Sequence, residues 1–409
     1  MLRSLSPLKC VALGLLVTIA QVFLALSFTN PNAGSWTDRY RTLVQHDSYW
    51  FANIIDRGYG TTLPPINHKE MEVSNVAFFP AYPLVTEALA RLARLDTYAA
   101  LLVTAQLATW VFWSYFFLFA QRWELSPPSQ VLGALAIMAH PAAFYLVAGY
   151  SESLFLAALV GFIYWSTREG RAANVLAVGH GIVLSATRIV GLPCALFPIV
   201  RSVFVKGWSR SENLRTWLWR QRVPVLISGF SMLGGLAFFA YCQASWGRWD
   251  IYMLTQNAGW GIRPDYLAVF RPSSYVFSLP EYFEPTRVSQ FTSALAGMLF
   301  IAIAAAELIV ALRGESGWGR RIGFYFCAAV IYYLSVAGVV SVQLESMLRY
   351  DLCVHALFVL GLLHFLRQIR VTPVFVRAFA MAAVAVACAG GFALQGYYVW
   401  NFSLGNWVA

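Results

Sequence analysis

The stretch QHDSYWFANIIDRGYG, residues 45–60, puts the carboxylate of Asp47 beside His46 and Tyr49 in a chain that has few charged residues. A carboxylate fixed among aromatic side chains could act as a base that accepts the proton of an attacking hydroxyl group. A structural role is also open, because Asp47 precedes a predicted helix. As an N-cap it would accept a backbone N–H bond and stabilise the helix by about 0.5–2 kcal/mol.

Two further segments place charged residues at predicted helix ends. In GYSESLFLA, residues 149–157, Ser151 and Glu152 fit an N-cap followed by a first-turn acid. In ESMLRYDL, residues 345–352, Arg349 fits an arginine that snorkels to the membrane surface. The alternative to these structural roles is a shared polar site.

The composition determines where such a site can lie. Of 409 residues, 59% are hydrophobic and only 12% are charged, and the mean hydropathy is +0.60. Soluble domains carry about 25% charged residues, so we predict an integral membrane protein. Apolar runs of about 20 residues are long enough for spanning helices and too long for barrel strands. The predicted fold is therefore an all-α polytopic membrane protein.

Net charge and cysteine content exclude other classes. The formal net charge of +10 could indicate nucleic-acid binding. Basic residues beside membrane spans explain it better, and we expect no nucleic-acid partner. The six cysteines lie within or at the edges of apolar runs and have no CxxC spacing, so they predict neither a metal site nor a disulfide framework.

The apolar runs predict eleven spans, at 9–29, 98–120, 128–149, 152–167, 173–187, 190–204, 222–243, 292–313, 321–342, 352–367 and 374–398. Basic residues gather in the short segments on one side, and acidic residues gather in the long segments on the other. The positive-inside rule then places the N-terminus in the cytoplasm. The loops 30–97 and 244–291 are extracytoplasmic, within one membrane domain, 1–409. Around Arg188, the two short spans of 173–204 could instead form a hairpin that does not fully cross.

The first of these loops has helical patterns of its own. Apolar residues of 48–57 share one helical face, and Gly58 fits a C-terminal cap. In 83–95, Glu87 and Arg91 have the i,i+4 spacing of an ion pair. We predict two interfacial helices that lie flat on the outer membrane surface.

Six short motifs follow one another along the chain. They are the aromatic-flanked Asp after the first span, VAFFPAYPL, YSES, ATRIVG, a WG–Q–WG pattern and LRY. The WG–Q–WG pattern consists of Trp246, Gly247, Gln256, Trp260 and Gly261. In this order they resemble the PIG-V-type mannosyltransferases, which include the second mannosyltransferase of GPI-anchor assembly and its bacterial relatives, within the GT-C superfamily. The resemblance spans nearly the whole chain and implies a GT-C-like helix bundle.

The resemblance implies a glycosyltransferase that moves a hexose, with mannose expected, from a polyprenyl-phosphate sugar to an acceptor hydroxyl. The transfer would invert the anomeric carbon on the extracytoplasmic face. Asp47 would be the catalytic base, and His46 would orient it or bind sugar. The other substrate-binding residues would be Tyr49, Glu152, Arg188, Gln256, Arg349 and Tyr350. The two arginines would stabilise the departing phosphate.

The expected partners follow from the same resemblance. They are membrane lipids, the lipid-linked donor and an acceptor glycolipid or glycan, with a partner membrane subunit left open. A DxD motif is absent from the sequence, and we expect no essential metal or other cofactor. The membrane would be the plasma membrane of a bacterium or the endoplasmic reticulum of a eukaryote.

Two features depart from the family pattern. His46 stands where the family has Trp before the Asp, and Ile189 and Val190 follow Arg188 where it has a small or polar residue and Asn. These departures leave the role of Asp47 intact and bear on the donor or the acceptor.

Three alternatives remain open. A lipid or sugar transporter would place ionisable residues near the bilayer midplane and repeat one half of the chain in the other. Another lipid-linked sugar transferase or a polymerase would use a different donor. A scaffold subunit would have lost catalysis.

Overall fold

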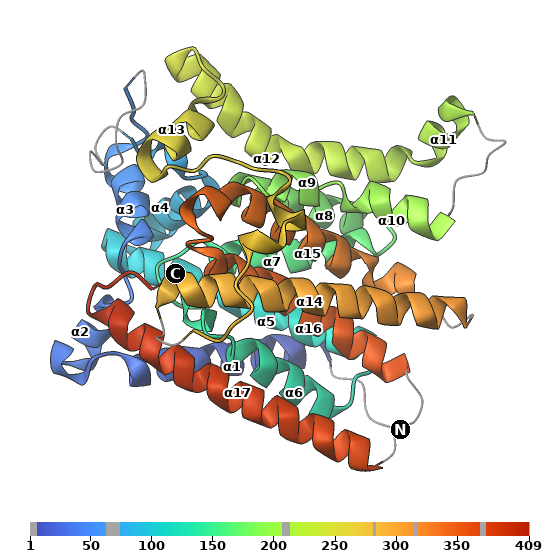
Figure 1. Cartoon of the computed structure of the whole chain (residues 1–409). Coiled ribbons are helices and arrows are strands. Elements are labelled where there is room, and N and C mark those ends of the chain that lie inside the picture. The colour runs from blue at the N-terminus through green and yellow to red at the C-terminus, as the bar shows by residue number, and fades with distance from the viewer. Residues whose placement is uncertain are drawn as a thin grey trace.

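The structure is a computed structural model that describes residues 6–62, 74–206, 213–280, 284–313, 317–368 and 374–408. Throughout these residues the regular elements are helices, and no strand is present. The long helices run side by side along one direction of the molecule (Figure 1). This arrangement confirms the predicted all-α class.

Seven helices are long and apolar enough to cross a membrane among the described residues. They are α1 (Pro7–Phe28), α5 (Thr97–Arg122), α12 (Arg222–Trp246), α14 (Pro285–Leu312), α15 (Trp318–Val339), α16 (Met347–Gln368) and α17 (Val374–Ser403). Two predicted spans form shorter helices, α7 (Glu152–Ser166) and α8 (Arg171–Thr187). The predicted count of eleven spans is therefore not confirmed.

The predicted span at 128–149 is wrong as a single helix. The helix α6 (Pro127–Met138) ends before Pro141, and a 3₁₀ turn, η4 (Ala143–Leu146), follows. Proline has no N–H to continue the helical ladder, and the N–H of Ala142 donates to His140 Nδ1 at 3.2 Å instead. An apolar composition thus did not ensure a continuous helix.

The predicted span at 190–204 is also interrupted. It consists of α9 (Gly191–Cys194) and α10 (Phe197–Lys206) with a bend between them. Pro198 lacks the N–H that would bond to the carbonyl of Cys194 in a continuous helix. The short α8 and the bent segment after it leave Arg188 in an extended conformation between two helices.

Close packing of α8 against α12 depends on small residues. A Cβ added at Gly234 of α12 would lie 2.1 Å from the carbonyl oxygen of Ile182 in α8. Small residues let membrane helices approach closely, so this contact fixes the position of the C-terminal end of α8.

Both helices predicted in the first loop are present. They are α3 (Asp47–Arg57) and α4 (Ala81–Ala93), and Gly58 ends the first with a φ of 77°. Glu87 and Arg91 form the predicted ion pair. Residues 63–73 of this loop lie outside the described residues.

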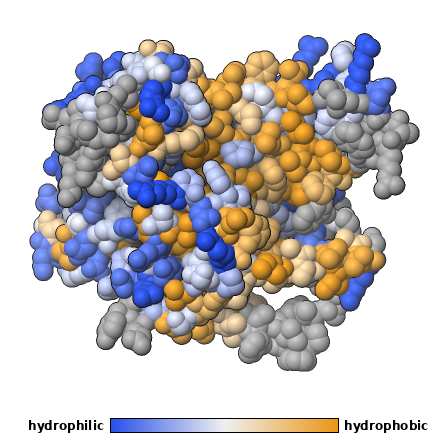
Figure 2. Space-filling model, turned by 45° about the horizontal axis from the view of Figure 1, so that its top comes forward, coloured by the Kyte–Doolittle hydropathy of each residue, from blue (hydrophilic) through white to orange (hydrophobic). Residues whose placement is uncertain are grey.

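The two ends of the bundle differ in character. The helices α3, α4 and α13 (Ile251–Trp260) lie at the left end in Figure 1, and α10 and α11 (Leu214–Arg220) lie at the right end. Figure 2 shows hydrophilic residues gathered at the left and hydrophobic residues spread over the middle. This distribution fits a bundle that crosses a bilayer and carries an ordered polar cap.

Candidate active site

A cavity of about 910 Å³ lies at the capped end of the bundle, between the first loop, α7, α13, α15 and α16. All eight residues predicted for the site line it: His46, Asp47, Tyr49, Glu152, Arg188, Gln256, Arg349 and Tyr350. The structure thus brings together side chains from five separate segments, and their roles remain predictions.

Asp47 is the first residue of α3, and its predicted role as N-cap is wrong. The N-cap position belongs to His46, which has a φ of 51° and makes no side-chain capping bond. The Asp47 carboxylate instead accepts a bond from Arg349, with 2.7 Å between Oδ2 and Nη1. A non-glycine residue with positive φ is strained, and such strain gathers at functional sites.

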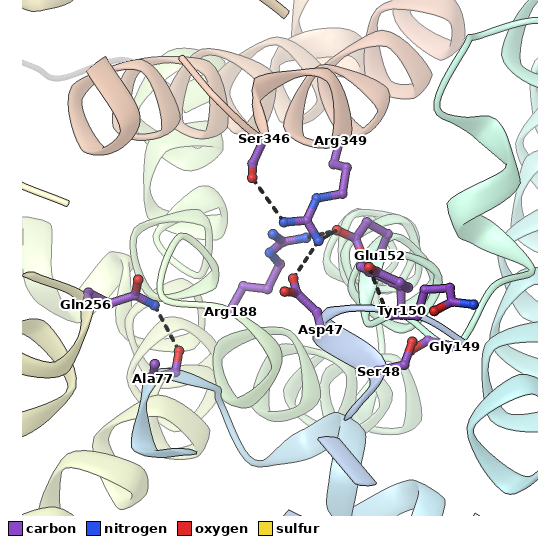
Figure 3. A network of polar contacts seen from close by, with 11 residues as sticks. Asp47, Ser48, Ala77, Gly149, Tyr150, Glu152, Arg188, Gln256, Ser346 and Arg349 are labelled. Carbon is purple, nitrogen blue, oxygen red and sulfur yellow. Dashed lines mark hydrogen bonds and ion pairs between the residues drawn. The ribbon is translucent and has the colours of Figure 1, made fainter. Parts of the chain in front are cut away.

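Glu152 links both arginines of the cavity. Its Oε1 lies 2.9 Å from Nη1 of Arg188 and 3.7 Å from Nη1 of Arg349. Figure 3 shows these side chains and Asp47 pointing toward one another. The two carboxylates and two guanidinium groups have formal charges that cancel.

Burial makes this four-residue charge cluster costly unless every group is paired. The Glu152 side chain is 1% exposed, and the Arg349 side chain is 6% exposed. Glu152 Oε2 and Arg349 Nε have no hydrogen-bond partner among the described residues. Buried polar atoms of this kind are available to a polar ligand that enters the cavity.

Aromatic rings hold the two guanidinium groups. The Cζ of Arg349 lies 5.3 Å from the ring centres of Tyr150 and Trp407, and the Cζ of Arg188 lies 4.7 Å from that of Tyr350. Arginine is attracted to the face of an aromatic ring at such distances. The rings therefore orient both cations without neutralising them. Burial lowers the pKa of Arg188, but the negative charge of Glu152 more than offsets this, so its pKa lies above the ordinary value.

His46 contacts the C-terminal segment rather than the Asp47 carboxylate. Its Nε2 lies 3.1 Å from the carbonyl oxygen of Asn406, and its ring packs edge-on against Trp407 at 5.1 Å. The carbonyl can only accept, so Nε2 carries the proton. Burial lowers the pKa of His46, so the neutral ring is favoured.

A group of aromatic side chains forms another wall. Trp50 stacks on Phe78 at 5.7 Å and lies 5.4 Å from Trp260. Gln256 anchors this wall, because its Nε2 donates to the carbonyl oxygen of Ala77 at 2.9 Å. The cavity is thus charged on one side and aromatic on the other.

The sequence motifs do not predict several other residues that line the cavity, among them Glu345, Ser346 and Trp407. Ser346 has a φ of 68° and accepts a 3.2 Å bond from Arg349 Nη2. Gln343 and Leu344 just before it also have positive φ. No glycine or asparagine marks this strained turn, so no residue type predicts it.

No protein-family model matches this chain, and no curated protein matches it. Its structure is similar to the archaeal oligosaccharyltransferase AglB from Archaeoglobus fulgidus, solved in complex with an inhibitory peptide and a dolichol-phosphate. The TM-score is 0.52 at 11% identity, over 94% of this chain and 56% of AglB. It is also similar to ArnT from Cupriavidus metallidurans bound to undecaprenyl phosphate, with a TM-score of 0.49 at 14% identity, over 97% of this chain and 75% of ArnT.

The likeness to AglB concerns the overall fold. It supports the predicted bundle of transmembrane helices, because this chain and AglB share an overall fold. The chain spans little more than half the length of AglB. The narrower resemblance to the PIG-V family is not confirmed. Among the described residues, no group of three His, Cys, Asp or Glu side chains is placed to hold a metal ion.

Proposed function

We propose that the protein is a membrane glycosyltransferase that transfers a hexose from a polyprenyl-phosphate sugar to an acceptor hydroxyl with inversion. Mannose is the first donor sugar to test, in line with the sequence motifs. The observation that carries the proposal is the cavity in which Asp47 lies 2.7 Å from Arg349 and shares that arginine with Glu152. AglB, whose overall fold is similar, was solved in complex with a dolichol-phosphate. This supports a lipid phosphate as the leaving group.

The chemistry needs one base and a stabilised leaving group. The acceptor oxygen attacks the anomeric carbon while the bond from that carbon to the phosphate oxygen breaks. The electron pair of the broken bond leaves with the phosphate, and Asp47 takes the proton of the acceptor hydroxyl. A phosphate is a good leaving group, so no general acid is required.

Arg188 and Arg349 would bind the phosphate. Guanidinium groups donate paired, charge-assisted bonds to phosphate oxygens. When Arg349 turns part of its donors to the phosphate, its bond to Asp47 weakens. A carboxylate that loses a cationic partner becomes a stronger base. Donor binding would therefore activate the base at the moment when it is needed.

The cavity would face the extracytoplasmic side, with the N-terminus in the cytoplasm. The partners would be membrane lipids, the lipid-linked donor and an acceptor glycolipid or glycan. The reaction would need no essential divalent metal.

The test uses the purified full chain in lipid nanodiscs, with polyprenyl-phosphate mannose or glucose labelled in the sugar and membrane glycolipid extract as acceptor. We expect the label to move from the donor to a new product, and Asp47→Asn to slow this transfer by about 10²–10⁴-fold, the usual contribution of a general base. Asp56→Asn is the matched control, because Asp56 is exposed near the other end of α3. Wild-type rates in Asp47→Asn, or no transfer from either sugar, would contradict the proposal.

A further inference from the structure

A second cavity lies at the opposite end of the bundle. Its volume is about 210 Å³, and it is lined by Phe119, Arg122, Trp123, Thr167, Arg201, Gly319 and Arg320. The helix α7 separates the two cavities, because it begins at Glu152 in the first and ends next to Thr167 in the second. Fifteen residues at a rise of about 1.5 Å each give about 22 Å between its ends.

The second cavity is strongly basic. Arg122, Arg201 and Arg320 line it, and Arg168 lies beside Arg122 with its Cζ 4.8 Å from the ring centre of Tyr164. The Cζ of Arg122 lies 5.8 Å from the same ring centre. The charges of the other three arginines are near enough to repel that of Arg122.

No carboxylate neutralises this arginine cluster within the part of the chain that the structure describes. None of its four members forms an ion pair there, although Glu169 interacts with Arg201 over a longer distance. Arg367, by contrast, lies outside the cavity and forms an ion pair with Glu124 at 2.5 Å. The cluster therefore keeps an excess of positive charge.

One arginine of the cavity is held by hydrogen bonds, and another has a buried donor without a partner. Arg122 donates to Thr167 Oγ1 at 2.7 Å and to its carbonyl oxygen at 2.9 Å, which fixes the guanidinium plane. The Nε of Arg201 is shielded from solvent and has no hydrogen-bond partner among the described residues. Basic residues that merely snorkel spread into water, whereas these converge on one hollow and leave a buried donor unsatisfied.

We propose that this second cavity binds the phosphate of an anionic lipid headgroup. Several guanidinium groups that converge without a carboxylate match the geometry and charge of a phosphate. We assign the phosphate to a lipid because the cavity lies at the C-terminal end of the spanning helix α5 and at the N-terminal end of the spanning helix α15. Trp123 and Phe119 give it a buried aromatic wall. Basic pockets between spanning helices bind such headgroups.

The test measures lipid retention by native mass spectrometry. The full chain is reconstituted with phosphatidylcholine and titrated with phosphatidylglycerol, and inorganic phosphate is titrated in a separate arm. We expect one phosphatidylglycerol to be retained preferentially, and Arg201→Gln to weaken this retention about tenfold, the effect of losing a charge-assisted bond. Arg171→Gln should retain the lipid like the wild type, because Arg171 is exposed at the start of α8 and lies outside the cavity.

Arg201→Lys tests the cavity even if Arg201→Gln fails to fold. It keeps the charge and loses the planar fork, so we expect retention between that of the wild type and that of the glutamine variant. Equal retention by the Arg201 and Arg171 variants would overturn the site. A response to inorganic phosphate as strong as that to phosphatidylglycerol would overturn its assignment to a lipid.

Discussion

Asp47 and Arg349 lie 302 positions apart in the chain, and their side chains form an ion pair of 2.7 Å in the wall of the larger cavity. Arg349 holds Ser346 with its other Nη atom and approaches Glu152 with the first. One guanidinium group thus joins the start of α3, the start of α7 and its own strained turn. The pair both builds the cavity and sets the charge of the proposed base.

Substitution of Arg349 by lysine separates charge from geometry. A lysine keeps the cation but cannot bond to Asp47 and Ser346 with the fixed fork of a guanidinium group. We expect kcat/KM for the lipid-linked donor to fall at least about tenfold, which corresponds to about 1.4 kcal/mol. The measurement is a donor titration in the transfer assay. Arg91→Lys on the exposed face of α4 is the control, and an unchanged donor titration in Arg349→Lys would remove its phosphate role.

Loss of the Glu152 charge should destabilise the protein. Arg188 would lose the ion pair that the described residues give it, and Arg349 would keep only its pair with Asp47. Breaking a buried ion pair by removing one partner costs about 3–5 kcal/mol. We therefore expect Glu152→Gln to unfold at clearly lower temperature in detergent. Glu87→Gln should change the midpoint little, because its ion pair with Arg91 lies on the surface. Equal midpoints for the two variants would show that the cluster does not stabilise the fold.

The burial of His46 predicts a pH effect on stability. Its pKa is lowered in the folded protein, mainly by burial, and is about 6.5 in an unfolded chain. The unfolded state then binds more protons below about pH 6.5, so stability is present above that pH and is lost as the pH falls toward the folded pKa. Thermal unfolding between pH 7 and 5 should show a smaller loss for His46→Gln than for the wild type. Parallel curves would mean that His46 does not contribute.

Two glycines of α12 provide a test of the α8–α12 contact. A Cβ at Gly234 would collide with the backbone of α8, whereas a Cβ at Gly229 would meet nothing within 4 Å. We expect Gly234→Ala to lower the free energy of unfolding by about 1–3 kcal/mol through overpacking. Gly229→Ala should be neutral or slightly stabilising, because alanine favours helix. Similar unfolding midpoints for both variants would contradict the close approach.

Much of the site could be predicted because the chain is mostly apolar and only 12% of its residues are charged. Charged residues such as Asp47, Glu152 and Arg349 at the ends of apolar runs have few places to lie except together. The prediction that Asp47 is the N-cap of its helix was wrong. Capping preferences describe a helix start in isolation, whereas here the ion pair with Arg349 and the positive φ of His46 determine the conformation.

Other features could not be read from composition. Apolar composition alone indicates a continuous helix at 128–149, although Pro141 marks the break. The strained turn before Arg349 contains no residue type that favours positive φ. Trp407 lies beside Arg349 only because the segment after α17 returns to the cavity. Such contacts depend on how helices that are distant in the sequence pack, and the spacing of apolar residues along the chain does not predict them.

The charge cluster of Asp47, Glu152, Arg188 and Arg349 is balanced before any donor arrives. If the proposed reaction occurs there, a phosphodiester with one negative charge enters, and a phosphomonoester with about −1.5 to −2 departs at pH 7. The same two guanidinium groups would then bind the polyprenyl phosphate product more tightly than the polyprenyl-phosphate sugar. Turnover would accordingly be governed by carrier release, and added polyprenyl phosphate would be a strong product inhibitor.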